Sequence, residues 1–288
     1  MRAGRTGEPV ASVPDSWTIW AFSDPHGVAT GLEAALVAAG LVDDRLRWSA
    51  PPRTALIGCG DYLDRGANSR RLIALLRRLE SEAEAAGGRA LFARGNHEQM
   101  LLQLRAGAYE WLDTWLDFGG RATLDSFGCD DLERDNPGPV FEAIEARAPG
   151  IFAWLARLPH AVRWRDVLLV HGGLPPWSRL EDLGRTTEQH LWVRSEFFAT
   201  DWSSGAFRGF EQAGIRRVVF GHTPATAGPC VFQDGRALCL DTNACGNPGL
   251  PPDAQLMATL ARLGTGNGFA ETEFVTVPTD QAPDRRPP

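Results

Sequence analysis

The sequence repeatedly places charged or polar side chains directly after a short apolar run, and residues 54–66 are the clearest case. The apolar run has the pattern of a buried strand. It stops at glycines and is followed by Asp61, Asp64 and Arg65. Two carboxylates and a guanidinium exceed what the end of a strand needs for solubility. The segment is therefore a candidate for chemistry, although the string by itself is also compatible with an ordinary polar loop.

The same order of strand, polar loop and helix recurs along the chain. Strands are predicted over five short apolar segments, residues 18–23, 54–57, 89–93, 167–170 and 217–220. Each is followed at once by polar groups, namely Asp24 and His26, Asp61, Asn96 and His97, His171, and His222. Because open α/β sheets bind ligands outside the carboxyl ends of their strands, we expect these strand ends to converge on one crevice. The other two histidines, His160 and His190, are expected to be structural.

Helices are predicted between these strands. Thr30 and Glu33 fit a capping box at the start of the first helix, and the second helix is expected over residues 68–86. Residues 99–165 show mainly helical periodicity and are predicted to form a helical insertion packed beside the sheet. Another helix is predicted over residues 187–198.

The chain of 288 residues is predicted to form a single domain over residues 16–277, closed by strands at 237–240 and 257–263. Residues 1–15 are polar and contain proline, so they are expected to form a flexible arm. Residues 278–288 are rich in Pro, Asp and Arg and are expected to be a disordered tail.

Composition limits which partners and which cellular location are expected for the chain. The formal charge of -7 disfavours a nucleic-acid surface, and no apolar stretch is long enough to span a membrane. The N-terminus also lacks the apolar core of a signal peptide, so a cytoplasmic location is expected. The five cysteines lie outside any C-x-x-C pattern, which indicates neither a disulfide framework nor a thiolate zinc site. The oligomeric state is left open.

The polar groups at the strand ends have the chemistry of metal ligands. Two aspartates, one asparagine and three histidines, without thiolates, favour Mn, Fe or Zn over Ca or Mg alone. Six ligands are too many for one ion that keeps an open position. Two ions about 3.5–4 Å apart, bridged by one carboxylate, fit that number better.

Five motifs in order over residues 17–245 resemble the signature of the PPP (phosphoprotein phosphatase) family of calcineurin-like metallophosphoesterases, in particular its bacterial and lambda-phage branch. They are Asp24-x-His26-Gly27, Gly60-Asp61-x-x-Asp64-Arg65-Gly66, Gly95-Asn96-His97-Glu98, His171-Gly172-Gly173 and Gly221-His222. The first motif departs from the family in having Ser23 where glycine is usual, and Pro25 fills its variable position. The segment after Asn243 is also unusually rich in Pro and Gly.

The resemblance implies an α/β fold, a four-layer α/β/β/α sandwich of two mixed sheets with a helical insertion. It also implies a ligand set for two divalent ions. The first ion would be held by Asp24, His26 and Asp61, and the second by Asp61, Asn96, His171 and His222, with Asp61 as the bridge.

The same resemblance suggests a mechanism. A metal-bridging hydroxide would attack phosphorus in line with the leaving oxygen. The phosphoryl oxygens would be bound by three arginines, Arg65, Arg94 and Arg194. His97 would protonate the leaving alcohol as general acid, and Asp64 would orient its ring.

The predicted function is a metal-dependent phosphatase that acts on phosphorylated serine or threonine of proteins or peptides, or with dual specificity. The rival enzyme is a symmetrical dinucleoside-tetraphosphate hydrolase or another small-molecule phosphoesterase. Glu98 favours the phosphatase, because those hydrolases resemble Gly-Asn-His-Asp more closely. A phosphopeptide-binding scaffold without activity is a more remote alternative, because a binder needs neither the acid nor both metals.

Overall fold

Two mixed β-sheets form the centre of the protein. The computed structural model describes residues 9–129, 131–247, 250–251, 254–266 and 268–279. The five-stranded sheet has the order β11 (Glu273–Pro278), β10 (Met257–Arg262), β2 (Thr18–Phe22), β3 (Thr54–Gly58) and β4 (Arg89–Phe92). The six-stranded sheet has the order β1 (Val10–Val13), β5 (Ala161–Trp164), β6 (Val167–Val170), β7 (Arg217–Phe220), β9 (Ala237–Cys239) and β8 (Cys230–Phe232). Within them, β2, β3 and β4 are parallel, as are β6, β7 and β9.

The strands alternate their side chains between two apolar layers. In β3, Ala55 and Ile57 join the core between the two sheets, whereas Leu56 points to the opposite face. In β6, Val167 joins the core between the sheets and Leu168 points to the outer face. Burial on both faces is why these segments are continuously apolar in sequence.

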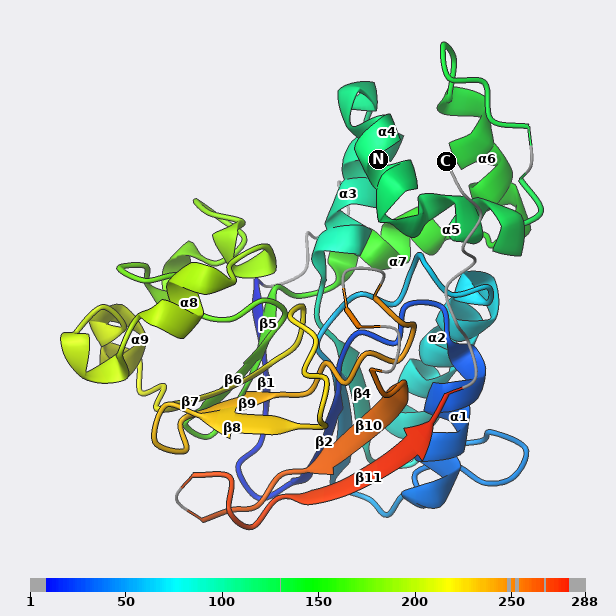
Figure 1. Ribbon diagram of the computed structural model, residues 1–288. Coiled ribbons are helices and arrows are strands. Elements are labelled where there is room, and N and C mark those ends of the chain that lie inside the picture. Colours follow the sequence, from blue (N-terminus) through cyan, green and yellow to red (C-terminus); the bar gives the residue numbers. More distant parts are fainter. Residues whose placement is uncertain (1–8, 130, 248–249, 252–253, 267, 280–288) are drawn as a thin grey trace, which may run out of the picture.

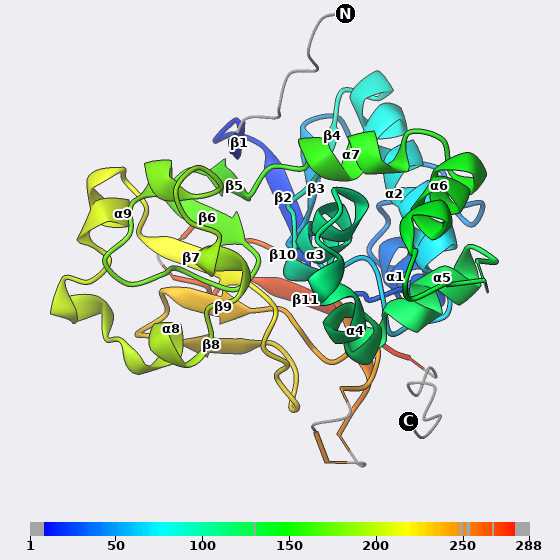
Figure 2. The ribbon, with the colours of Figure 1, turned by 90° about the horizontal axis from the view of Figure 1, so that it is seen from above.

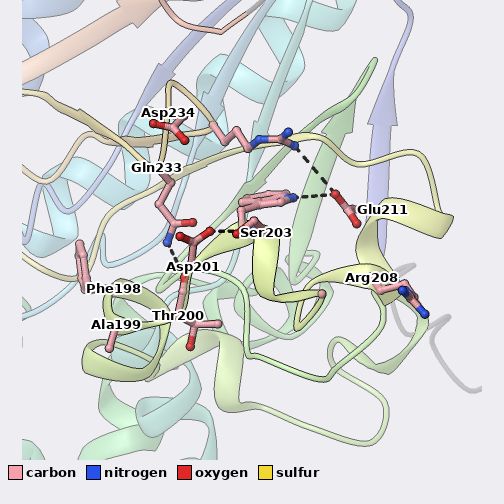
Figure 3. Close-up of a pocket in the computed structure, with 12 residues that line it drawn as sticks. Phe198, Ala199, Thr200, Asp201, Ser203, Arg208, Glu211, Gln233 and Asp234 are labelled. Carbon is pink, nitrogen blue, oxygen red and sulfur yellow. Dashed lines mark hydrogen bonds and ion pairs between the residues drawn. The ribbon is translucent and has the colours of Figure 1, made fainter.

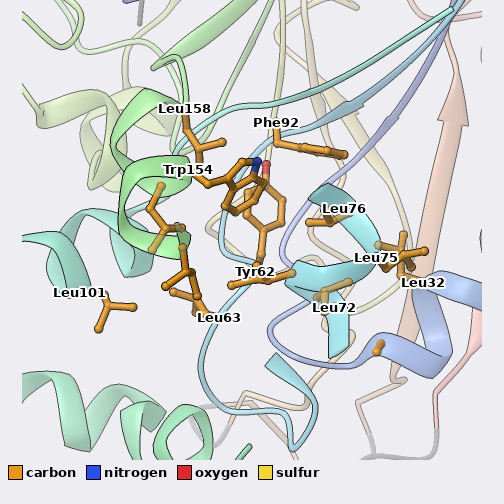
Figure 4. Packing of buried hydrophobic residues seen from close by; sticks show 14 of the residues in the cluster. Leu32, Tyr62, Leu63, Leu72, Leu75, Leu76, Phe92, Leu101, Trp154 and Leu158 are labelled. Atoms are coloured by element: carbon orange, nitrogen blue, oxygen red, sulfur yellow. The ribbon is translucent and has the colours of Figure 1, made fainter. Parts of the chain in front are cut away.

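Helices cover both outer faces and complete four layers (Figures 1 and 2). Outside the five-stranded sheet, α1 (Ala29–Ala38) contacts β10 and β11, and α2 (Ser69–Ala85) contacts β4. Figure 4 shows the leucines of this layer packed near Phe92. The six-stranded sheet is covered by short elements, η3 (Leu180–Asp182), η4 (Gln189–Leu191), α8 (Ser195–Ala199), η5 (Trp202–Ser204) and α9 (Arg208–Gln212). The predicted four-layer fold class is confirmed.

The helical insertion lies beside the five-stranded sheet. Its elements are α3 (Asn96–Arg105), η1 (Tyr109–Trp111), α4 (Leu112–Trp115), the π-helical η2 (Leu116–Gly120), α5 (Arg121–Ser126), α6 (Gly138–Arg147) and α7 (Ile151–Arg157). Trp154 of α7 joins it to the sheet, with its ring centroid 6.2 Å from that of Phe92. The insertion was predicted through residue 165, but Ala161–Trp164 are strand β5, which pairs with β6.

Two predictions about the ends of the chain need correction. Val10–Val13 are not part of a loose arm, because they form β1 and pair with β5; residues 1–8 lie outside the described chain. The predicted tail begins too early, since Pro278 ends β11 and the buried Thr279 donates a 2.6 Å hydrogen bond to the carbonyl of Ala244. Residues 280–288 lie outside the described chain. No helix among the described residues is long and apolar enough to cross a membrane.

Two helix predictions were also wrong in detail. The capping box does not form, because α1 begins at Ala29 and Glu33 instead forms an ion pair with Arg71. The helix predicted over residues 187–198 is broken into η4 and α8, because the backbone at Arg194 is not helical.

Candidate metal and active site

The five predicted strand ends meet where the two sheets adjoin. The loops after β2 and β3 are joined by backbone hydrogen bonds, since the Asp24 N–H donates to Gly60 and the His26 N–H to Asp61. Six site residues have left-handed backbone, with φ between +40° and +69°: Asp24, His26, Asp61, Asp64, Arg65 and His222. Such conformations are unfavourable for residues other than glycine and concentrate at functional sites.

The first group of ligand atoms comes from the five-stranded sheet. His26 Nε2 lies 3.5 Å from Asp61 Oδ2 and 3.9 Å from Asp24 Oδ1. The other ring nitrogen of His26 faces the carbonyl of Leu63 at 2.9 Å, which fixes Nδ1 as the protonated nitrogen and leaves the Nε2 lone pair free. Asp24 Oδ1 is buried without a hydrogen-bond partner among the described residues.

The second group combines both sheets around His171 Nε2. This atom lies 2.7 Å from Asn96 Oδ1, 3.1 Å from His222 Nδ1 and 3.4 Å from Asp61 Oδ2. Its other nitrogen faces the carbonyl of Cys59 at 2.9 Å, so Nε2 is the nitrogen that remains for a metal. Metal–ligand bonds of about 2.1 Å place neighbouring ligand atoms about 3 Å apart, so these separations suit a cation between them.

The pKa values of the buried aspartates and histidines indicate that a cation would stabilise this site. Burial raises the pKa of Asp24 to about 6, and nearby Asp61 adds to this. Burial alone would lower the pKa of His171, but the carboxylates of Asp61 and Asp24 raise it to about 9. Burial also holds the pKa values of His26 and His222 well below the ordinary value, so both are neutral imidazoles. Carboxylates with neutral imidazoles are the donor set that divalent metals require.

Asp61 is the residue shared by both groups. Two clusters of described residues could each hold a metal ion, His26 with Asp61 and His97, and Asp61 with His171 and His222. The predicted ligands Asp24, His26, Asp61, Asn96, His171 and His222 are therefore all brought together. Their assignment to individual ions stays a prediction.

His97 has a second set of contacts that sets it apart from the other imidazoles. Its Nδ1 lies 2.7 Å from Asp64 Oδ2, and its Nε2 lies 3.8 Å from Asp61 Oδ2. The Arg65 guanidinium lies 3.4 Å from the same Nε2. A cationic guanidinium beside Nε2 disfavours a metal there, so the contacts favour a proton-transfer role over a ligand role.

Asp64 is held by two residues of the helical insertion that the sequence did not indicate. Trp115 Nε1 donates to Asp64 Oδ2 at 2.9 Å, and the Thr123 hydroxyl donates to Asp64 Oδ1 at 2.5 Å. The same hydroxyl accepts the backbone N–H of Asp64 at 2.9 Å. The insertion thus fixes the carboxylate that faces His97.

Thr123→Val is expected to remove the hydrogen bonds between the Thr123 hydroxyl and Asp64 while keeping the shape of the side chain. Loss of a buried hydrogen bond to a charged group should lower the free energy of unfolding by about 1.5–3 kcal/mol. Chemical denaturation checks the stability, and turnover of an alkyl phosphate should fall as His97 loses its fixed partner. Thr114→Val, at a half-buried position of α4, serves as the control. Unchanged stability and turnover in Thr123→Val would contradict the proposed support.

Two of the three predicted phosphate-binding arginines reach the site. The Arg65 side chain contacts His97 and is hydrogen-bonded to Cys245. Burial lowers the pKa of Arg194, and the carboxylates of Asp24, Asp241 and Asp61 oppose this, so its guanidinium lies near the candidate ligands.

The structure contradicts the predicted phosphate-binding role of Arg94. Its guanidinium donates to Gln99 Oε1 at 2.8 Å and to the carbonyls of Leu155 and Ala156 at 3.2 and 2.7 Å. These carbonyls belong to the last turn of α7, where a cation satisfies otherwise unpaired acceptors. Arg94 therefore attaches the insertion and is turned away from the ligands.

Two acidic residues of the site were missed as functional candidates. Glu98 is buried and accepts the backbone N–H groups of Asp61, Tyr62 and Gly95 at 2.8–2.9 Å, so it holds the ligand loops. Burial and the charge of Asp61 raise its pKa to about 7. Asp241 lies near Asp24, and burial raises its pKa well above the ordinary value. It directly follows a predicted strand, the signal that identified the other site residues.

A separate cavity of about 640 Å³ lies beside α8 and α9. Figure 3 shows hydrogen bonds among some of the residues that line it: Trp202 Nε1 donates to Glu211 at 2.9 Å, and Gln233 donates to the carbonyl of Thr200 at 3.0 Å. The residues described as lining it include none of the predicted site residues.

Adjoining groups of metal-type ligands at the junction of a two-sheet sandwich define the class of metal-dependent phosphoesterases. Residues 18–226 match the calcineurin-like phosphoesterase family, and the chain belongs to that family. The predicted resemblance and class of enzyme, a metal-dependent phosphatase, are confirmed at the level of the family.

Known proteins agree with this placement. Shewanella-like protein phosphatase 2 of Arabidopsis thaliana is 31% identical over 181 residues, 54% of this chain and 46% of the relative, so the match spans about half of that protein. Serine/threonine-protein phosphatase 1 of Salmonella typhimurium is 29% identical over 214 residues, 72% of this chain and 78% of the relative. A solved structure of a cold-active protein tyrosine phosphatase is 18% identical with a TM-score of 0.65, covering 90% of this chain and 77% of that chain. That likeness shows the fold.

Proposed function

We propose that the chain hydrolyses phosphate monoesters on proteins, using two divalent ions. The observation that carries the proposal is the position of Asp61, whose Oδ2 lies 3.4–3.8 Å from the Nε2 atoms of His26, His97 and His171. A carboxylate shared by imidazoles of two groups suits a bridge between two ions. When bound, the two ions supply Lewis-acid activation of water and neutralise phosphoryl charge.

The protein's own residues would act around the phosphoryl group in three ways. Arg65 and Arg194 would bind its oxygens and stabilise the charge of the transition state. His97 would hold a proton on Nε2 and donate it to the leaving oxygen, because Nδ1 is occupied by Asp64. Glu98 would keep the ligand loops in place.

The substrate class proposed first is phosphorylated serine or threonine in proteins or peptides. The names of the two relatives, both protein phosphatases, support this choice. The carboxylate, amide and imidazole donors favour Mn, with Fe and Zn as the alternatives.

A turnover panel with Mn²⁺ tests the proposal. Phosphoserine, phosphothreonine and phosphotyrosine peptides of one sequence are compared with diadenosine tetraphosphate, each with and without a chelator. We expect chelator-sensitive release of phosphate from the peptides. A strong preference for diadenosine tetraphosphate would contradict the proposed protein substrate and identify a dinucleotide hydrolase. Tight binding of phosphopeptides without any turnover would identify a scaffold.

A further inference from the structure

Two exposed aromatic rings stand beside imidazoles of the candidate site. The ring centroid of Phe118 lies 6.2 Å from that of His97, and the centroid of Trp192 lies 6.3 Å from that of His222 in an edge-to-face arrangement. Phe118 is 40% exposed and Trp192 is 41% exposed. Their places beside the proposed acid and beside a candidate ligand put them at two sides of the reaction centre.

Both rings belong to segments that form backbone hydrogen bonds with residues of the candidate site. Phe118 lies in the π-helical η2, and the next residue, Gly119, accepts the backbone N–H of Arg65 at 3.0 Å. Gly119 has a φ of +102°, and a Cβ there would collide with Arg65, so this close approach requires glycine.

The segment that contains Trp192 is hydrogen-bonded to the loop of the second ligand group. The carbonyl of His190 accepts the N–H of Gly172, which directly follows the candidate ligand His171, at 2.8 Å. Trp192 in turn donates its own N–H to Gln189 at 2.9 Å. In Figures 1 and 2, α4, which precedes Phe118, and α8, which follows Trp192, belong to different parts of the molecule. The two rings therefore approach the site from different sides.

From these contacts we infer that Phe118 and Trp192 are specificity-determining residues that let the site accept aryl phosphates, of the phosphotyrosine type, beside alkyl ones. The inference rests on the proposed function. The acid must lie next to the leaving oxygen, so the carbon bonded to that oxygen comes close to His97 and hence to Phe118. A phenolic ring is bonded directly to the phosphoryl oxygen and can meet an aromatic edge or face there. A nucleobase is separated from its phosphate by a ribose and cannot reach the same place.

The test compares Phe118→Leu and Trp192→Leu on phosphotyrosine and phosphoserine peptides of one sequence. Each variant is expected to lower kcat/KM for phosphotyrosine roughly 2- to 10-fold and for phosphoserine by less than about twofold. Phe274→Leu and Trp111→Leu are matched controls, because these side chains are 41% and 48% exposed on β11 and η1. Both controls should leave the phosphotyrosine to phosphoserine ratio unchanged.

A binding measurement provides a readout besides turnover. Phenylphosphonate should inhibit more tightly than methylphosphonate, and each variant at Phe118 or Trp192 should reduce that preference roughly 2- to 10-fold. Equal losses on both peptides, or no preference for phenylphosphonate, would overturn the aryl inference while leaving the phosphatase standing. Turnover of neither peptide would overturn the proposed function and the inference with it.

Discussion

Asp61→Asn is expected to abolish metal binding and turnover together. The substitution keeps the shape of the side chain. In the native protein Asp61 Oδ1 accepts the backbone N–H of His97 at 3.1 Å, and the amide oxygen of the new asparagine can still do so. An NH₂ group in place of Oδ2, however, points a donor at the Nε2 atoms of His26 and His171. Since a metal centre supplies several kcal/mol of transition-state stabilisation, turnover should fall about 10³-fold or more.

Metal content by mass spectrometry, measured with turnover on the same sample, checks this expectation. Asp234→Asn, at an exposed position of the turn between β8 and β9, is the control for loss of one aspartate charge. Circular dichroism should show that Asp61→Asn remains folded. An Asp61→Asn protein with two bound ions and full turnover would rule out the bridge.

His97→Asn is expected to slow hydrolysis of alkyl phosphates by roughly 10²–10⁴-fold. A phosphoserine peptide needs a proton at its leaving oxygen, whereas p-nitrophenyl phosphate has a good leaving group and should lose less. Steady-state kinetics on the two substrates give the comparison. Equal losses would indicate that His97 only positions the substrate.

Metal content tests whether His97 acts as a general acid, as its contacts favour, or as a metal ligand. A general acid can be removed with both ions retained, whereas a ligand cannot. Asp64→Asn should reproduce most of the loss on phosphoserine, because His97 then loses the carboxylate that orients its Nδ1. Full activity in Asp64→Asn would contradict the pairing.

The candidate ligands could be predicted from sequence because each lies within four positions of the end of a strand. Asp61 and His171 come three positions and one position after the last residues of β3 and β6. The direction of the parallel strands then determines which edge of the sheet they reach. The same logic extends to Asp241 after β9, although the sequence interpretation did not use it.

The support of the site could not be predicted in this way, because it depends on packing between distant segments. Trp115 and Thr123 are 51 and 59 positions from Asp64, inside helices whose placement no local pattern determines. The prediction that Arg94 binds phosphate was wrong for a related reason. It lies two positions before Asn96, but the carbonyls at the end of α7 determine where its long side chain turns.

The position of the site between two sheets makes it dependent on contacts between distant parts of the chain. The hydrogen bond from the His222 N–H to Asp24 joins residues 198 positions apart. Contacts of such separation require closure of a long loop, so they form only after local structure has lowered its entropic cost. The ligand set is therefore incomplete until the sheets have docked, and an ion held by both sheets binds the folded chain in preference to its intermediates. We therefore expect capture of metal to be a late folding event, and bound ions to favour the docked sheets.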